Sequence, residues 1–304
     1  MKRFRFGILT SLHDDDAVTL LRDLDSALVS GRITADVPCV LCNVPERPSD
    51  DKLAQRVAAV KALKSLKNLI FFPSREFQPE LREQARKDPA LLARWRMEHD
   101  RAVLQLLPQD TKLYLSVGYM QILSSEILNA LDVLNLHPAI PQIGPIGMWT
   151  KVMEEQAERP LPYLLAVPHE HLAQEIPKIM SISHLKAGGM LHIATEQTDR
   201  GPVISWYEFP LSSERLTRLW LEVTALVRAH GLEHVKREPV WKELIRQIRR
   251  EQFAGETPLI VLTLEKLSQG LWEIKERTLH IEGRPYPYGY CLNRELAAFS
   301  RPPN

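Results

Sequence analysis

The first half of the chain alternates short apolar runs with longer amphipathic segments, which limits the folds that it can adopt. The apolar runs predict buried strands at 4–9, 37–44, 68–72, 112–117 and 133–137. The segments between them predict helices at 15–29, 50–66, 77–107 (interrupted by Pro79 and Pro89) and 124–131. Strands and helices in this alternation form a parallel sheet that helices cover on both faces. We therefore expect an α/β fold whose ligands gather at the carboxyl ends of the strands.

The second half is organised differently. The stretch 144–186 is rich in proline and contains two helix-like pieces, and 189–209 reads as a hairpin at the sheet edge. Helices are expected at 212–230 and 240–253. The last fifty residues mix a short strand, a helix and a hairpin around 281–284. The length of 304 residues supports one large domain, or one of about 200 residues with an extension.

Composition excludes several classes of protein. The net charge of +1 argues against a broadly basic nucleic-acid binder. No apolar stretch approaches the length of a membrane-spanning helix, and the N-terminus lacks the long apolar run of a signal peptide. The three cysteines cannot build a disulfide scaffold and fit a reducing compartment. We expect a cytoplasmic protein with neither a membrane nor a nucleic acid as its partner.

Two polar residues end one predicted strand. Asn135 and His137 are one residue apart, so the strand period of two places both on one face, and Pro138 then ends the strand pairing. An amide beside an imidazole can stabilise an oxyanion and move a proton, as acyl transfer requires. A polar strand end without catalytic function has the same pattern, and spacing alone does not separate the two.

Asp199 lies in the turn TEQTDRGPV. Aspartate is common in turns because its side chain bonds to the turn backbone. A carboxylate at this place can instead orient an imidazole and raise its pKa. Both interpretations are open on the residues alone.

Four motifs in order along the chain favour the catalytic interpretation of these residues: GYMQILSSEIL, LNLHPAIP, HIATEQTDRGPVI and EGRPYPYGY. Together they resemble the folate-dependent formyltransferase family, most of all its glycinamide ribonucleotide formyltransferases. The resemblance runs from about residue 4 to 210, with a looser echo at 281–290. It implies a Rossmann-like formyltransferase fold, with a catalytic domain over 1–210 and a helical extension over 211–304.

The resemblance also implies a reaction: transfer of a formyl group from 10-formyltetrahydrofolate to an amine. The family's catalytic Asn, His and Asp match Asn135, His137 and Asp199. Its folate cleft matches two loops and one strand residue, which we expect to contain Met120, Gln121, Ile122, Leu123, Leu134, Thr195, Glu196, Gln197 and Thr198. The loops after the first and third strands would bind the acceptor through Ser11, His13, Asp14, Ser74 and Arg75.

The sequence departs from the family in the parts that bind the acceptor. The family's first loop is glycine-rich and holds a phosphate, whereas residues 10–16 here read TSLHDDD. The usual Ser after His-Pro is Ala139, the following Leu-Leu-Pro is shortened, and an insertion lies between 149 and 186. The aspartates can cap and charge the next helix, and they disfavour a nearby phosphate. We therefore expect a small-molecule amine acceptor that is not a phosphoribosyl amine.

Other candidate sites have simpler interpretations. The run His169-Glu170-His171 lacks the spacing of a metal motif, so we expect no metal. Cys39 and Cys42 fall in a predicted strand and are expected to be buried apolar residues rather than a redox pair. The basic helix at 242–250 is expected to present a solvated face.

Alternative functions stay open at this point. A 10-formyltetrahydrofolate hydrolase would use the same three catalytic residues. An aminoacyl-tRNA formyltransferase also carries a C-terminal extension, but the charges over 211–304 are nearly balanced. A non-catalytic folate-binding or interaction module would have little need for all three residues. The apolar helices after residue 211 could pair two subunits in a homodimer.

Overall fold

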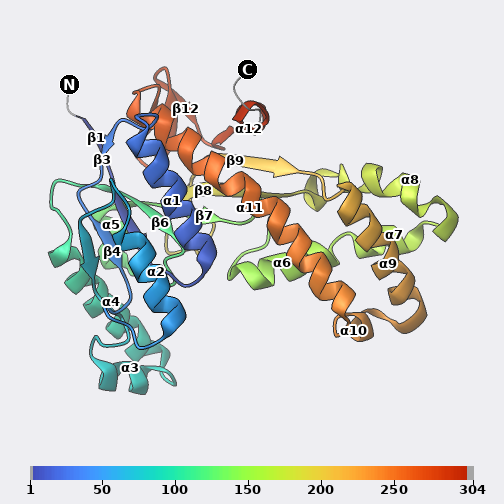
Figure 1. Ribbon diagram of the computed structural model, residues 1–304, viewed down its shortest axis with the longest axis horizontal. Coiled ribbons are helices and arrows are strands. Elements are labelled where there is room, and N and C mark those ends of the chain that lie inside the picture. Colours follow the sequence, from blue (N-terminus) through green and yellow to red (C-terminus); the bar gives the residue numbers. More distant parts are fainter. Residues whose placement is uncertain (1–2, 300–304) are drawn as a thin grey trace. The chain divides into compact units, whose positions relative to one another are not determined.

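A computed structural model describes residues 3–299 of the chain (Figure 1). These residues form two compact units that interleave along the sequence. Unit 1 consists of 3–136, 191–204 and 260–289, and unit 2 of 137–190, 205–259 and 290–299. The units therefore do not follow chain order, and the assignment of 1–210 and 211–304 to a catalytic domain and an extension stays a prediction.

The first helix lies as the sequence predicts, whereas the single strand predicted at 4–9 is divided into β1 (Phe4–Arg5) and β2 (Gly7–Thr10), which belong to different sheets. Strand β2 (Gly7–Thr10) is fully buried, and helix α1 spans Asp15–Val29, the predicted bounds. Asp14 begins the helix, because its Oδ1 accepts a hydrogen bond of 3.0 Å from the backbone N–H of Ala17. The predicted capping role of the aspartate loop is confirmed for Asp14.

The main sheet is mostly parallel. Its strand order is β13-β9-β8-β7-β6-β2-β4-β5, and the pairs β7–β6, β6–β2, β2–β4 and β4–β5 are all parallel. Parallel strands end at the same edge, so the loops after β2, β4, β5 and β6 gather there. The bounds of the remaining parallel strands are β4 Val40–Cys42, β5 Leu69–Phe71, β6 Leu113–Val117 and β7 Asp132–His137.

Prolines set the helix starts in the charged part of unit 1. Pro79 and Pro89 each occupy the first turn of a helix, where a missing N–H costs nothing. The predicted interruptions of 77–107 are therefore the beginnings of two separate helices. The helices of this part are α2 Asp51–Lys61, α3 Pro79–Ala85, α4 Pro89–Leu106 and α5 Ser125–Ala130.

The predicted hairpin forms from β8 (Ala187–Ile193) and β9 (Val203–Phe209). The short strand β13 (Tyr290–Cys291) pairs with β9 and forms the edge of the sheet. The prediction that the hairpin itself forms this edge is therefore wrong. A second pair, β1 (Phe4–Arg5) with β3 (Ala35–Asp36), stands apart from the main sheet.

The insertion contains three α-helices rather than the two predicted pieces: α6 Trp149–Glu158, α7 Leu161–Ala166 and α8 His169–Met180, followed by a 3₁₀ turn at Ser183–Leu185. Pro160 and Pro168 divide them, since each immediately precedes a new helix. Within unit 2, α9 (Glu214–His230) packs beside α7 and α8 (Figure 1). The fully buried Trp220 belongs to the core that these helices share.

Helix α11 is longer than predicted. It spans Pro239–Ser268 and continues through Pro258, whereas the sequence pattern predicted an end at residue 253. The buried apolar run that begins at Leu259 explains the difference, because tertiary burial outweighs the local cost of a proline. A short helix, α10 (Leu232–Val235), precedes it.

The C-terminal part of unit 1 confirms the predicted hairpin. Strands β11 (Thr278–Ile281) and β12 (Arg284–Tyr286) pair antiparallel around Glu282 and Gly283, both at positive φ as a tight turn requires. Strand β10 (Trp272–Lys275) completes this small sheet. Helix α12 (Asn293–Phe299) belongs to unit 2. Over residues 3–299 no helix has both the length and the apolar character needed to cross a membrane.

Candidate functional site

A hydrogen-bond network joins the loops at the carboxyl edge of the unit 1 sheet. The hydroxyl of Ser11, after β2, accepts hydrogen bonds from the Met120 N–H at 2.9 Å and from the Asn43 side-chain amide at 3.4 Å. The amide oxygen of Asn43 accepts from the Ser74 N–H at 2.7 Å. Ser11 and Ser74, both expected to bind the acceptor, are buried and hold neighbouring loops together.

The loop after β6 presents apolar side chains and unpaired peptide groups. Met120 and Ile122 are 42% and 56% exposed. The Ser124 N–H donates to the buried carboxylate of Asp100 at 2.6 Å, which fixes the far end of the loop. Between these ends, the peptide N–H groups of residues 121–123 have no hydrogen-bond partner within the described part of the chain. The loop therefore offers backbone donors beside an apolar surface.

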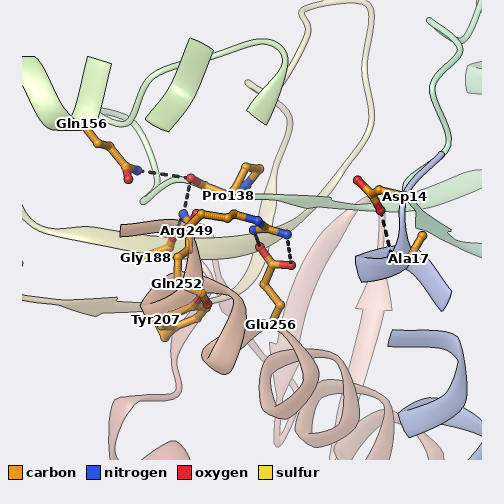
Figure 2. Close-up of polar contacts among 9 residues, drawn as sticks. All are labelled: Asp14, Ala17, Pro138, Gln156, Gly188, Tyr207, Arg249, Gln252 and Glu256. Carbon is orange, nitrogen blue, oxygen red and sulfur yellow. Dashed lines mark hydrogen bonds and ion pairs between the residues drawn. The ribbon is translucent and has the colours of Figure 1, made fainter. Parts of the chain in front are cut away.

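The aspartate loop after β2 is held by a cation. Arg56 pairs with Asp15 at 2.7 Å and donates to the backbone carbonyls of His13 at 2.6 Å and Leu12 at 3.4 Å. Asp14 caps helix α1 through the Ala17 N–H (Figure 2). Two carbonyls of the loop therefore face Arg56, and the carboxylate of Asp14 occupies the N-terminus of α1.

Three polar side chains of unit 1 meet beside strands β7 and β8. Asn135 comes from β7, His192 from β8, and Asp199 from the turn between β8 and β9. The Asn135 Nδ2 lies 3.2 Å from His192 Nε2 and 3.4 Å from Asp199 Oδ1. The His192 Nε2 and Asp199 Oδ1 atoms are 3.7 Å apart. His192 is 1% exposed and Asp199 8%, whereas Asn135 is half-buried.

The partners of His192 indicate its tautomer. Its Nδ1 lies 3.1 Å from the backbone carbonyl of Ile193, which can only accept a hydrogen bond. A neutral ring therefore carries its proton on Nδ1 and leaves Nε2 as an acceptor for the Asn135 amide. The second amide hydrogen of Asn135 then points to Asp199.

The turn that carries Asp199 has an unusual backbone. Asp199 has a φ of +56°, a conformation that aspartate tolerates better than most residues. A side chain at Gly201 would place its Cβ 1.7 Å from the Ile193 carbonyl oxygen, so only glycine fits there. Asp199 is therefore a turn residue whose buried carboxylate also faces Asn135 and His192.

His137 ends β7 and lies in unit 2. Its side chain is 2% exposed, and its Nε2 lies 2.8 Å from the backbone carbonyl of Pro145. Because a carbonyl can only accept, Nε2 carries a proton in this contact. His137 and Asn135 belong to one strand and one face, as predicted, and an orienting role of Asp199 toward His137 stays a prediction.

The other expected site residues differ in exposure. His13, Arg75, Glu196, Gln197 and Thr198 are exposed, and Thr195 and Gln121 are half-buried. Leu134 is fully buried, and strand alternation places it on the face opposite to Asn135. Its neighbour Val133 shares the face of Asn135 and a core cluster with Leu123. Val133 is also fully buried, and a contribution of Leu134 to the folate cleft stays a prediction.

Two residues of the site carry no distinguishing sequence pattern. Asn43 lies within the motif VLCNVPERP but has no distinguishing spacing. His192 was detectable in principle, because it is the one ionisable side chain in the fully buried strand Ala187–Ile193. A buried histidine in a strand is common as a core residue, so the pattern alone did not mark it.

Other candidate sites have structural explanations. Cys39 and Cys42 are buried free thiols, as predicted, and burial raises the pKa of Cys42 to about 12. No group of three or more His, Cys, Asp or Glu residues within 3–299 is placed to hold a metal ion. The prediction of a wholly solvated face at 242–250 is wrong at Arg249, which pairs with the buried Glu256.

The fold is that of the formyltransferases, as comparison with solved structures shows. The phosphoribosylglycinamide formyltransferase of Coxiella burnetii, solved in complex with CHES, is similar at a TM-score of 0.55 and 12% identity, over 95% of this chain and 99% of that chain. Glycinamide ribonucleotide transformylase 1 of Symbiobacterium toebii is similar at a TM-score of 0.50 and 17% identity, over 92% and 94% of the two chains. No family model matches the sequence, and no curated protein matches it.

Proposed function

We propose that this chain is a folate-dependent enzyme that transfers the formyl group of 10-formyltetrahydrofolate to the amine of a small molecule. One observation carries the proposal: the Asn135–His192–Asp199 cluster beside strands β7 and β8 of a formyltransferase fold, with His137 two residues after Asn135 on β7. An amide, two imidazoles and a buried carboxylate are the groups that acyl transfer uses.

Asn135 is the proposed oxyanion donor. Both of its amide hydrogens have partners, but the contact with Asp199 is long at 3.4 Å. When the amine nitrogen bonds to the formyl carbon, the carbonyl oxygen gains negative charge and offers a stronger acceptor. We infer that Asn135 exchanges its bond to Asp199 for this oxygen and keeps its bond to His192, which holds the amide in place.

His137 is the proposed proton carrier. Attack by a neutral amine leaves a positive nitrogen, which must lose a proton, while the folate nitrogen must gain one as its bond to the formyl carbon breaks. An imidazole can do both in turn. The resemblance to the family implies that Asp199 assists this transfer.

The folate would be held at the loop after β6. The unpaired N–H groups of residues 121–123 can donate to a heteroaromatic ring edge, and Met120 and Ile122 supply the apolar contact. Leu123, which is half-buried, adds to this apolar surface. The donor brings an activated formyl group, and these residues bind and orient it.

The acceptor is proposed to lack a phosphoribosyl group. A phosphate is bound by convergent N–H groups, often at a helix start. In this chain Asp14 covers the start of α1, and the Leu12 and His13 carbonyls face Arg56. Arg56 offsets the charge of Asp15, but its donors are directed at the loop itself. An acceptor with hydroxyl or amine groups suits the carboxylates better.

A panel of amines with 10-formyltetrahydrofolate tests the proposal, with tetrahydrofolate release and formylated product measured in parallel. Transfer requires both products in equal amounts and their loss in Asn135→Ala. Release of formate without an amine would identify a hydrolase instead. Binding without release would identify a non-catalytic folate-binding module. Efficient saturation kinetics with glycinamide ribonucleotide would contradict the inference about the acceptor.

A further inference from the structure

The backbone carbonyl of Pro138, the residue after His137, accepts hydrogen bonds from two glutamine side chains of unit 2 (Figure 2). Gln156 Nε2, from α6, donates at 3.3 Å, and Gln252 Nε2, from α11, makes a shorter bond. Both glutamines are buried. One peptide next to the proposed proton carrier is thus held from two helices.

Gln252 joins two strands through a single amide group. Its Nε2 donates to the Pro138 carbonyl and to the Gly188 carbonyl on β8, so both amide hydrogens have acceptors. A rotated amide would place its oxygen against two carbonyl oxygens, which fixes the orientation of the side chain. The amide therefore sets the spacing between the end of β7 and the start of β8.

The packing around Gln252 is close and rigid. The hydroxyl of the buried Tyr207 donates to the Gln252 backbone carbonyl, and burial keeps its pKa well above the ordinary value, so the phenol stays protonated. A Cβ on Gly255 would lie 2.4 Å from the Tyr207 ring. About one turn away on each side, Arg249 forms an ion pair with the buried Glu256. Helix α11 thus has little freedom to shift along β9.

Helix α6 holds the rest of the loop after His137. Arg159, at its end, donates to the Ile143 carbonyl at 2.8 Å. The loop between Pro138 and Ile143 leads to Pro145, whose carbonyl bonds the His137 ring. The backbone beside His137 and the acceptor of its ring therefore belong to one loop that α6 fastens at two points.

We propose that Gln156 and Gln252 are positioning residues for His137, and that the insertion at 149–186 and the segment after 211 act together through the Pro138 carbonyl. The inference rests on the proposed function for its catalytic meaning. Loss of either glutamine frees the peptide after His137 and lets the ring leave its bond with Pro145. Small displacements of a catalytic group cost turnover more than binding.

The test compares Gln252→Leu and Gln156→Leu with Gln247→Leu as the matched control. Gln247 lies on α11 and is also buried, at 8% exposed, and its side-chain amide nitrogen donates to Glu251. The first readout is the NMR signal of the His137 ring, assigned with His137→Ala and measured without folate. We expect it to move in both test variants and to stay in place in the control.

The second readout is turnover. With an active enzyme, we expect kcat to fall about tenfold in each test variant with KM for the folate nearly unchanged. Gln252→Glu adds a pH signature, because a carboxylic acid can donate to one carbonyl and a carboxylate to none. Its kcat relative to wild type should therefore fall as pH rises through the titration of the new carboxyl.

The two readouts fail in different ways. Folded test variants whose His137 signal matches wild type overturn the positioning role, whatever the enzyme's activity. If Gln252→Leu does not fold, Gln156→Leu, which removes one bond of 3.3 Å, decides the question. A moved His137 signal in a protein that neither transfers nor releases formyl groups supports the positioning role and refutes the proposed function.

Discussion

The side-chain amide nitrogen of Asn135 lies 3.2 Å from Nε2 of His192, a residue of the adjacent strand β8. The Ile193 carbonyl holds the proton of His192 on Nδ1, which leaves Nε2 to accept from the amide. This pair fixes one amide hydrogen of Asn135 and leaves the other on a long bond to Asp199. The geometry thus specifies which donor is available to a reacting oxygen.

Asn135→Ala and His137→Ala should each lower turnover at least about a hundredfold, the scale of losing one oxyanion or proton-transfer group. Folate affinity should change little, since neither residue lies in the loop proposed to bind the ring. Steady-state kinetics measures the turnover of each variant, and calorimetry measures its affinity for the folate. Near-normal turnover in either variant contradicts the roles assigned.

His192→Phe should lower turnover about tenfold or more, because Asn135 loses an acceptor whose bond is worth about 1 kcal/mol and whose loss lets the amide rotate. Phenylalanine fills a similar buried volume. His280→Phe, on β11, provides the control, since its Nδ1 bonds only locally to the Thr278 carbonyl. Equal kinetics in the two variants would remove His192 from the site.

Asp199→Asn should lower turnover about a hundredfold without loss of the fold. Asparagine, like aspartate, tolerates the φ of +56° at this position, so the turn should persist while the charge is removed. Asp199→Ala should add a loss of stability, since alanine adopts this conformation less readily. Thermal unfolding separates the two effects, and an active Asp199→Asn enzyme would argue for a purely structural turn residue.

Gly201→Ala should destabilise the turn by about 1–3 kcal/mol, because the new Cβ meets the Ile193 carbonyl oxygen. Gly31→Ala is the comparison: Gly31 has a φ of +75° but open space around it, so only backbone strain of about 1 kcal/mol is expected. Denaturant unfolding of both variants measures the difference. Equal losses would mean that the close approach at Gly201 is relieved without cost.

Cys42 should make stability fall with rising pH. Burial raises the pKa of its thiol from 9.0 to about 12, so the folded state keeps a proton that the unfolded chain loses above pH 9.0. The contribution is complete below that pH, and about 0.8 kcal/mol is lost by about pH 9.5. Cys42→Ala should lack this part of the dependence. A difference in unfolding free energy between wild type and Cys42→Ala that stays constant between pH 7 and about pH 9.5 would contradict the burial of the thiol in solution.

Most of the parallel sheet could be predicted from the sequence, because buried strands and amphipathic helices leave strong periodic patterns. Helix α1 was predicted with its observed bounds, since Asp14 and Gly31 mark its two ends. Helix α11 was predicted too short. A local pattern that contains Pro258 cannot reveal that the residues after it are buried by other elements.

The site could be predicted only in part for a related reason. Asn135 and Asp199 stand in recognisable motifs, and the structure places their side chains together. His192 and Gln252 have no such motif, because their roles arise from contacts with residues far away in the sequence.

Formyl transfer can be followed by NMR of 10-formyltetrahydrofolate with an isotope-labelled formyl carbon, incubated with the protein and an amine panel. We expect the label to leave the folate and to appear in a formamide. We also expect Asn135→Ala to slow this step at least about a hundredfold while the folate still binds. A label that stays on the folate with every amine, or leaves at the same rate in Asn135→Ala, would contradict the proposed function.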